Sequence, residues 1–187
     1  FGAQVCMTDA GHASGSDRIE EVTRILDLSD DDIVVNVQGD EPLIPPAVIN
    51  QVAENLKNNI EAGLCSLYEN IKSSNKTNDP NAVKVVTDIQ GMALYFSRSL
   101  IPFNRGNSQG DTEDSFEEAS YKRHIGLYAY RVKTLHNFVN WPLSELESIE
   151  KLEQLRFMEN GIKIHMVQSL ESIPAGVDTE TDLAQIK

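Results

Sequence analysis

Short apolar runs and longer stretches of helical periodicity alternate through the first third of the chain. The apolar runs at residues 4–7, 33–37 and 63–68 predict β-strands. Residues 33–37 are rich in β-branched side chains, which is typical of an interior strand in a parallel sheet.

Two helices are predicted between these strands, the first with Ser16 or Asp17 as its N-cap and an end near Leu28. Its apolar face is expected to consist of Ile19, Val22, Ile25 and Leu26. The second helix opens at Pro45 and Pro46, since proline suits the first turn of a helix. Its apolar positions are Val48, Ile49, Val52 and Leu56. The alternation of strands and helices predicts an α/β fold with a doubly wound, mostly parallel sheet.

The middle of the chain has a different pattern. Residues 83–86 and 92–96 are strand-like runs joined by a polar, glycine-containing connection, which predicts a β-hairpin. Residues 104–120 are polar and rich in Gly, Ser, Asp and Glu, as expected of a surface loop. Another strand is predicted at residues 124–131.

The last third predicts a short helix at residues 132–139, a longer helix, and a strand at residues 162–167. Ser144 is expected to cap the longer helix, which runs to about Asn160 and ends at Gly161. Its apolar stripe should be buried and consists of Leu146, Ile149, Leu152, Leu155 and Met158.

Composition fits one globular domain that spans residues 1–187, with 40% hydrophobic residues. The net charge of −13 argues against binding to nucleic acid. No apolar run approaches the length of a membrane span, so we expect no membrane partner. Cys6 and Cys65 lie in apolar runs without C-x-x-C spacing, which favours free thiols in a reducing cytoplasm over a zinc site.

Polar chemistry directly follows the predicted strand at residues 33–37, in the sequence Gln38-Gly39-Asp40-Glu41-Pro42. In open α/β sheets, ligands bind beyond the carboxyl ends of the strands. A glycine there lets a ligand approach the backbone, and carboxylate oxygens suit a hard cation. Taken alone, this segment supports a ligand site and an acidic turn between a strand and a helix equally well.

Ordered motifs along almost the whole chain resemble the cytidylyltransferases that activate the sugar acid Kdo (3-deoxy-manno-octulosonate). The motifs are His-x-Ser-Gly-Ser-Asp-Arg at 12–18, Val-Gln-Gly-Asp-Glu-Pro-Leu-Ile-Pro-Pro at 37–46, Asn-Ala-Val-Lys-Val-Val at 81–86, Tyr-Phe-Ser-Arg-Ser-Leu-Ile-Pro at 95–102, Arg-His-Ile-Gly-Leu-Tyr-Ala-Tyr-Arg at 123–131, Glu-Lys-Leu-Glu-Gln-Leu-Arg at 150–156 and Gly-Val-Asp-Thr at 176–179. Each motif alone is weak evidence, but their order along the chain is specific.

The resemblance implies an enzyme that transfers CMP from CTP to the anomeric hydroxyl of Kdo, giving CMP-Kdo and pyrophosphate for lipopolysaccharide. It also implies a nucleotide-diphospho-sugar transferase-like fold, a homodimer, and a small hairpin-containing subdomain at about residues 83–131 that covers the sugar and contributes the dimer contact. A cytidylyltransferase for a related sugar acid, such as amino-Kdo or sialic acid, is the nearest alternative. A non-catalytic sugar-nucleotide-binding or dimerisation fragment is an alternative of a different class.

The resemblance further implies Mg²⁺ as cofactor, held by Asp40 and Asp178 as the catalytic carboxylates. Mg²⁺ usually takes one or two protein carboxylates, with phosphate oxygens and water as its other ligands. On sequence alone, Asp178 is better interpreted as a cap or dipole partner of a final short helix.

The implied nucleotide contacts are Ser14, Gly15, Arg18 and Gln38. A Ser-Gly pair at the start of a helix presents free backbone N–H groups, and a helix N-terminus favours anions. Without the resemblance, Ser14 and Gly15 describe a plain helix cap, and Gln38 a side chain that stabilises a turn.

The implied sugar contacts are Gln38, Arg98, His124, Tyr128, Glu150, Glu153 and Gln154. Arginine binds a carboxylate with two parallel hydrogen bonds, whereas histidine and tyrosine bind hydroxyls. Strand alternation places Tyr128 and Tyr130 on the same face as His124, with Arg123 on the other face. Glu150 and Gln154 are four residues apart on a helical pattern, for which a solvated face is the default interpretation.

The chain begins at Phe1, whereas the resemblance implies an earlier strand and a basic, glycine-rich loop for the triphosphate. We therefore expect an N-terminally truncated nucleotidyltransferase domain with little or no activity by itself. The net charge of −13 would repel a polyanionic nucleotide unless metal and that loop offset it.

Overall fold

A mixed sheet of six strands runs through the protein, for which we describe a computed structural model. The structure describes residues 2–12, 14–39, 41–71, 79–105 and 121–173, together with residues 177, 180 and 184. The strands are β1 (Ile33–Asn36), β2 (Leu64–Asn70), β3 (Lys84–Thr87), β4 (Ala93–Ser97), β5 (Lys122–Arg131) and β6 (Ile164–Gln168). The helices are α1 (Gly15–Ile25), α2 (Pro46–Asn58), α4 (Val132–Phe138), α5 (Glu145–Glu150) and α6 (Gln154–Glu159).

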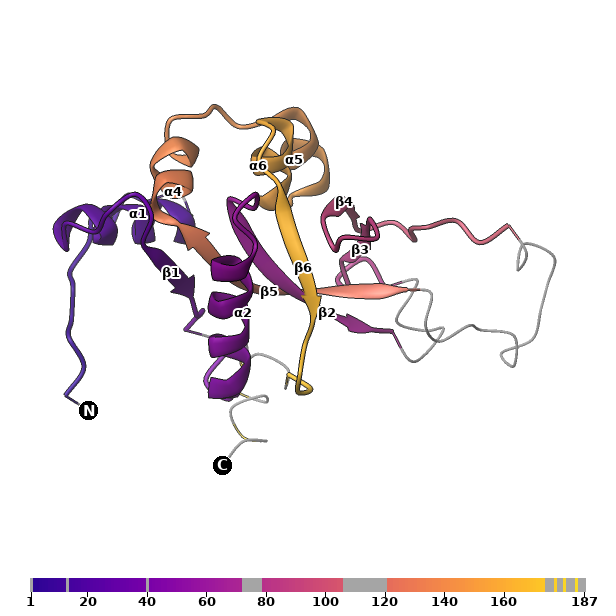
Figure 1. Ribbon diagram of the computed structural model, residues 1–187, viewed down its shortest axis with the longest axis horizontal. Helices are drawn as coiled ribbons and strands as arrows, with labels where there is room; N and C mark the ends of the chain where they lie inside the picture. Colours follow the sequence, from indigo (N-terminus) through magenta and orange to yellow (C-terminus); the bar gives the residue numbers. More distant parts are fainter. Residues whose placement is uncertain are drawn as a thin grey trace.

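The long strand β5 lies at the centre of this sheet, as Figure 1 shows. Along one edge it pairs with β2, which pairs in turn with β6. The C-terminal half of β5 also pairs with β1, and its N-terminal end pairs with β3 of the hairpin β3–β4. One strand therefore joins the main sheet to the hairpin, and the predicted hairpin is confirmed.

Strand direction is more mixed than predicted. Among the described pairings only β2 with β6 is parallel, and β1 pairs antiparallel with β5. The prediction that residues 33–37 form an interior strand of a parallel sheet is therefore wrong for the described part of the sheet. A β-branched run is compatible with both parallel and antiparallel pairing. The direction of β1 relative to its neighbour is therefore set by β5, the distant strand with which it pairs.

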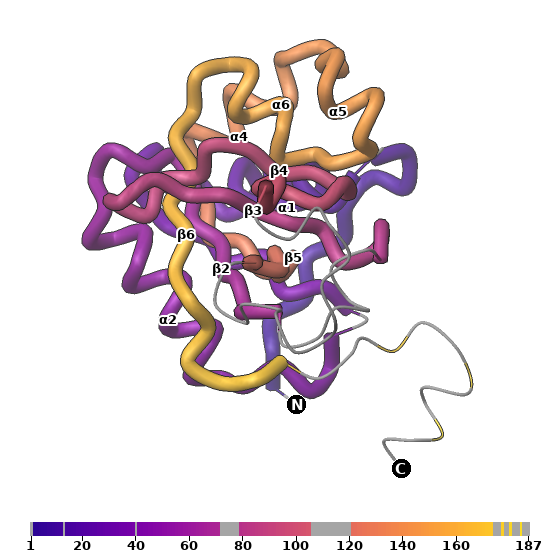
Figure 2. Tube along the Cα trace, turned by 90° about the vertical axis from the view of Figure 1, so that its right-hand side faces the viewer, coloured from indigo at the N-terminus to yellow at the C-terminus, as the bar shows by residue number. Residues whose placement is uncertain are grey.

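Helices cover the sheet on both faces. Against one face, α2 packs Val48, Val52 and Leu56 onto Cys65 and Leu127. On the other side, α4 and α6 contribute to a second core, which includes Leu64, Tyr130, Leu135, Phe138, Leu155, Phe157, Ile164 and Met166. The separation of α2 from α4 and α6 is visible in Figure 2. Coverage of both faces agrees with the predicted doubly wound arrangement.

The N-terminal segment and α1 differ from the prediction. Residues 4–7 form no strand with any described residue; Val5 and Met7 are each 84% exposed, and the segment runs away from the sheet in Figure 1. In α1 the buried side chains are Ser16, Glu20 and Thr23, whereas the expected apolar residues Ile25 and Leu26 are 54% and 50% exposed. These polar side chains can be buried because they contact polar groups of other elements. One example is His136 of α4, whose Nε2 lies 3.1 Å from Thr23 Oγ1.

The long helix predicted from Ser144 to Asn160 is two short helices. Ser144 is the N-cap of α5, and its backbone N–H donates to Glu147 Oε2 at 3.4 Å, but Lys151 adopts a left-handed conformation (φ 55°) and ends that helix. The chain then turns and begins α6 at Gln154. Because of this break, Glu150 and Gln154 no longer share a helix face.

The predicted surface loop at 104–120 lies mostly outside the described residues. Among the helices that the structure describes, none has the length and apolar composition needed to cross a bilayer.

Candidate active site

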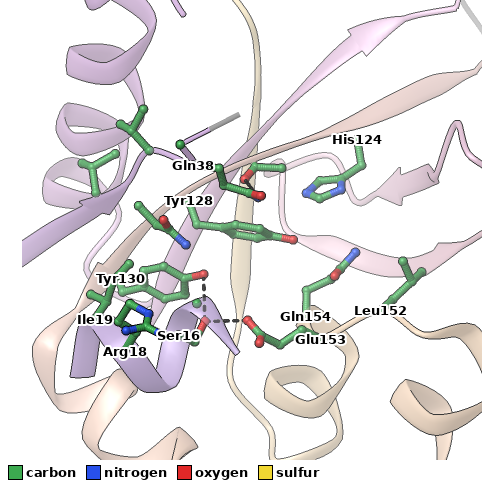
Figure 3. A pocket seen from close by; sticks show the side chains of 16 residues that line it. Ser16, Arg18, Ile19, Gln38, His124, Tyr128, Tyr130, Leu152, Glu153 and Gln154 are labelled. Atoms are coloured by element: carbon green, nitrogen blue, oxygen red, sulfur yellow. Dashed lines mark hydrogen bonds between the residues drawn. The ribbon is translucent and has the colours of Figure 1, made fainter. Parts of the chain in front are cut away.

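A cavity of about 760 Å³ opens between the N-terminal end of α1, the end of β1, one face of β5 and the turn before α6 (Figure 3). It is lined by Gly15, Ser16, Arg18 and Ile19 from α1, Val35, Asn36, Val37, Gln38 and Gly39 from the β1 end, His124, Gly126, Tyr128 and Tyr130 from β5, and Leu152, Glu153 and Gln154 from the turn into α6. Segments far apart in the sequence thus converge on one concave surface that combines apolar area with several polar side chains, as ligand sites commonly do.

The wall formed by β5 carries a stack of rings. The His124 and Tyr128 ring centroids are 5.3 Å apart, and those of Tyr128 and Tyr130 are 5.6 Å apart (Figure 3). Arg123 points elsewhere and forms an ion pair with Glu69 at 2.9 Å. The predicted alternation of faces along this strand is therefore confirmed.

Burial keeps this wall uncharged at neutral pH. It lowers the pKa of His124 to about 3, and the Arg123 charge adds to the effect. Burial also raises the pKa of Tyr128 well above its ordinary value, with Tyr130 and Glu153 contributing. A neutral imidazole and a protonated phenol can exchange hydrogen bonds with the hydroxyls of a ligand.

Opposite the rings, Glu153 presents a carboxylate held by α1. Ser16 Oγ donates to Glu153 Oε1 at 2.5 Å and lies 3.4 Å from the Tyr130 hydroxyl (Figure 3). Burial raises the pKa of Glu153, and the hydrogen bonds from Ser16 and Ser14 and the charge of Arg156 oppose that rise. The network links α1 to the turn before α6.

Gln154 has unused hydrogen-bonding capacity. Its side chain is 5% exposed, and its amide Nε2 has no hydrogen-bond partner among the described residues. A buried amide N–H without a partner costs free energy, so an acceptor on a ligand would be favoured there.

The comparisons with known proteins agree with this architecture. Residues 1–164 match the cytidylyltransferase family model. A 3-deoxy-manno-octulosonate cytidylyltransferase of Saccharophagus degradans is 52% identical over 189 residues, covering 100% of this chain and 74% of that protein. One of Cellvibrio japonicus is 54% identical over 188 residues, with the same coverage of 100% and 74%. The chain belongs to the cytidylyltransferase family.

A solved structure confirms the predicted fold class. The structure of CMP:2-keto-3-deoxy-manno-octonic acid synthetase complexed with CTP matches with a TM-score of 0.85 and 35% identity. The match covers 99% of this chain and 71% of that one. The predicted resemblance to Kdo cytidylyltransferases is confirmed by the relatives above.

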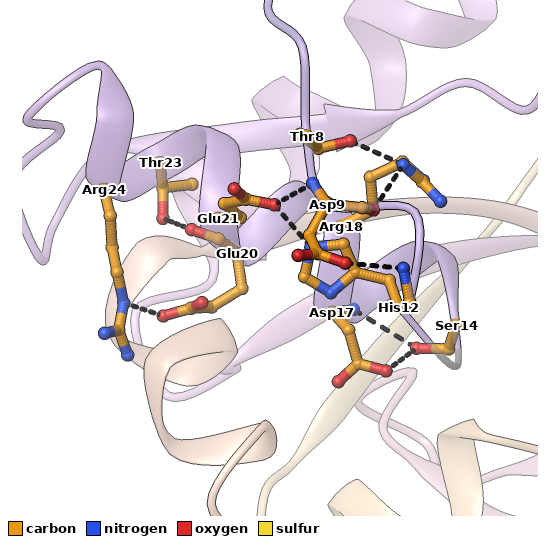
Figure 4. A network of polar contacts seen from close by, with 11 residues as sticks. Thr8, Asp9, His12, Ser14, Asp17, Arg18, Glu20, Glu21, Thr23 and Arg24 are labelled. Carbon is orange, nitrogen blue, oxygen red and sulfur yellow. Dashed lines mark hydrogen bonds and ion pairs between the residues drawn. The ribbon is translucent and has the colours of Figure 1, made fainter.

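In this cytidylyltransferase, most of the predicted contacts that the structure describes line the cavity. They are Gly15, Arg18, Gln38, His124, Tyr128, Glu153 and Gln154. Ser14 is not among the lining residues; it is the N-cap of α1, where its Oγ accepts from the Asp17 N–H at 3.2 Å. Arg18 is also tied to the N-terminal segment, because its Nη1 donates to Thr8 Oγ1 at 2.5 Å and to the Asp9 carbonyl at 3.2 Å (Figure 4).

Arg98 and Glu150 are placed elsewhere, in a cluster with Ser97 and Lys84 that we term the hairpin junction. Glu150 accepts from Ser97 Oγ at 2.6 Å and from the Arg98 backbone N–H at 3.0 Å. The Arg98 side chain donates to the Glu150 carbonyl at 2.8 Å and the Pro80 carbonyl at 3.0 Å. The break at Lys151 turns Glu150 toward the hairpin, so its role as a sugar contact stays a prediction without a place in the cavity.

The predicted metal ligands Asp40 and Asp178 lie outside the described residues. Gly39, which precedes Asp40, lines the cavity.

The sequence predicts Ser16 or Asp17 as the N-cap of α1, but the N-cap is Ser14, and the buried Ser16 hydroxyl instead donates to Glu153. Gly126, which lines the cavity, was not among the predicted site residues either. A glycine inside a strand pattern indicates a bulge or a close backbone approach, and Gly126 lies inside the strand predicted at residues 124–131.

Proposed function

We propose that the chain carries most of the active site of an enzyme that transfers CMP from CTP to the anomeric hydroxyl of Kdo. The observation that carries this proposal is the polar cavity wall of His124, Tyr128 and Gln154, in a chain 52% identical to a protein named for that activity. The products would be CMP-Kdo, which supplies lipopolysaccharide synthesis, and pyrophosphate.

The cavity divides by chemistry. The N-terminal end of α1, with Ser14, Gly15 and Arg18, suits the nucleotide, because free backbone N–H groups and an arginine favour an anion. The neutral ring of His124, the Tyr128 phenol and the Gln154 amide suit the hydroxyls of a sugar acid. Gln38 lies beside Gly126, to whose carbonyl its Nε2 donates at 3.3 Å.

These residues would act by positioning. The attacking group is the sugar's own hydroxyl, so no protein nucleophile is needed. Holding that hydroxyl in line with the α-phosphorus lowers the barrier through orientation and the exclusion of water. Glu153, fixed by Ser16, would accept a hydrogen bond from a sugar hydroxyl at the boundary between the two halves.

Mg²⁺ would be held by Asp40, next to the cavity-lining Gly39, and by Asp178. When bound, the ion neutralises phosphate charge and stabilises the leaving pyrophosphate. Asp40→Ala should abolish turnover, whereas near-normal kcat in that variant would remove Asp40 from the metal site.

We also propose a homodimer in the cytoplasm. The exposed apolar side chains Leu94 and Phe103, on and after the hairpin, support a contact between subunits there. Both cysteines are free thiols, which suits a reducing compartment. Analytical ultracentrifugation would test the dimer, and a monomer at micromolar concentration would contradict it.

The function is tested by pyrophosphate release from CTP with Kdo, with amino-Kdo and sialic acid as competing substrates. The assay uses the 187-residue chain and a version extended at its N-terminus to the length of the relatives, of which the chain covers 74%. Kdo-dependent release with CTP supports the proposal. Failure of the extended version to turn over CTP with Kdo, or a clear preference for another sugar acid, would overturn it.

A further inference from the structure

Strand β5 contains a bulge where it borders the cavity. Ser66 of β2 pairs with Tyr128, but the next residue, Leu67, pairs with Ile125. Gly126 and Leu127 therefore have no partner in β2 at this point. A bulge changes the aim of neighbouring side chains, here those of His124 and Tyr128.

The backbone carbonyls of the bulge are satisfied by side chains. Ser66 Oγ lies 2.8 Å from the Ile125 carbonyl oxygen and 3.0 Å from that of Leu127. On the cavity side, Gln38 Nε2 donates to the Gly126 carbonyl at 3.3 Å. The single proton of the Ser66 hydroxyl is therefore shared between these two carbonyls, where the regular ladder is interrupted. The Ser66 side chain is fully buried.

The same hydroxyl lies 3.0 Å from His124 Nε2. A serine hydroxyl has one proton, and a carbonyl oxygen can only accept. If Ser66 donates to the bulge carbonyls, its oxygen must accept from His124, so Nε2 carries the imidazole proton. Because burial keeps the ring neutral, Nδ1 is then an acceptor.

The ring is also fixed in place. The Phe96 ring meets it edge to face, with centroids 5.1 Å apart, and Tyr128 packs on it at 5.3 Å. Among the described residues, its hydrogen bond is made through Nε2, while the side chain lines the cavity. Nδ1 is therefore the atom that His124 can offer to a ligand.

We propose that Ser66 is a positioning residue of the sugar site: it fixes the bulge in β5 and the Nε2–H tautomer of His124, so that Nδ1 accepts a hydrogen bond from a substrate hydroxyl. The inference rests on the proposed function for the identity of that substrate, a polyhydroxylated sugar acid. The placement of Ser66, the bulge and His124 does not depend on it.

The tautomer is measured first, by long-range ¹⁵N–¹H correlation NMR of the imidazole in the 187-residue chain. The expected spectrum is that of a neutral ring protonated at Nε2. A ring protonated at Nδ1 would overturn the proposal whatever the enzyme's activity, and this measurement needs no variant that folds and no substrate.

Steady-state kinetics of the version extended to the length of the relatives then test the consequence. Ser66→Ala should raise KM for Kdo about tenfold, with KM for CTP changed less than about twofold, because one hydrogen bond to the sugar is lost. In the Ser66→Ala background, His124→Ala should add little further effect, since Ser66 acts through His124. Cys65→Ala is the matched control: Cys65 is equally buried on β2 but packs into the core on the opposite face.

If Ser66→Ala raised KM for both substrates equally and lowered Tm as Cys65→Ala does, Ser66 would be a structural residue and the proposal would be overturned. Independent, additive effects of Ser66→Ala and His124→Ala would also overturn it. If the native protein does not use CTP and Kdo, the proposed function fails, and the tautomer measurement still decides the placement of Ser66.

Discussion

The hairpin junction and the cavity wall both hold polar side chains away from solvent, but they differ in how far hydrogen bonds satisfy those side chains. At the junction, Lys84 Nζ donates to the carbonyls of Asp79 and Arg98 at 2.9 and 2.6 Å, and Glu150 accepts from Ser97 and Arg98. At the wall, the Gln154 amide has no partner among the described residues, and the His124 ring is bonded through Nε2.

This difference separates residues that hold the fold together from residues available to a ligand. A saturated cluster gains nothing from a ligand, whereas an unsatisfied buried group does. In the sequence, Glu150 and Gln154 look equivalent, because both are polar residues one helical turn apart. Only their hydrogen bonds distinguish them.

The largest expected effect is on stability, at the hairpin junction. Glu150→Ala removes a carboxylate that accepts two hydrogen bonds and should lower the free energy of unfolding by about 2–3 kcal/mol. Urea denaturation measures it, with the exposed Glu54→Ala on α2 as a control expected to change little. A stable Glu150→Ala protein with a raised KM for Kdo would instead return Glu150 to the sugar site.

Acid should destabilise the cavity wall through His124. Its pKa is about 3 in the folded protein against an ordinary 6.5, so between these values the unfolded state binds more protons. Stability is therefore lost as pH falls below about 6.5, by about 2 kcal/mol at pH 5 from this group. Urea denaturation at several pH values across this range measures the dependence of the free energy of unfolding on pH. In His124→Gln, the contribution of this group to that dependence should be absent. An unchanged slope would mean that the imidazole is solvated.

Gln154→Leu should separate binding from stability. Leucine has a similar size without the unpaired amide, so the free energy of unfolding should stay the same or rise slightly. Loss of a hydrogen bond to the substrate should raise KM for Kdo by about five- to thirtyfold, equivalent to about 1–2 kcal/mol. Steady-state kinetics with each substrate varied in turn would reveal it. Unaltered sugar kinetics would show that the amide meets water and not substrate.

The smallest effect is expected at Lys151, which directs Glu150 to the junction and Gln154 to the cavity. Its left-handed conformation (φ 55°) suits glycine better than lysine. Lys151→Gly should therefore raise the free energy of unfolding by about 0.5–1 kcal/mol while leaving KM for both substrates unchanged. Destabilisation by this change would indicate that the lysine side chain contributes contacts that outweigh the backbone strain.

The sequence by itself determined the elements whose pattern is local. The periodicity of α2, the hairpin, and the positions of β2, β5 and β6 follow from residues close together in the chain. Alternation along β5 was sufficient to place His124, Tyr128 and Tyr130 on one face, and the ordered motifs identified the family. These features needed no knowledge of what lies across the sheet.

Tertiary structure alone decided the rest. The antiparallel pairing of β1 depends on where β5 enters the sheet, and the polar buried stripe of α1 depends on His136 and Glu153 as partners from elsewhere in the chain. The break at Lys151 has no strong local signal, since neither glycine nor proline marks it. Side-chain periodicity indicates which residues share a face of a helix or strand. The hydrogen-bond partners that stabilise a buried polar group come from distant segments, so only the tertiary structure shows whether such a residue is satisfied within the fold or available to a ligand.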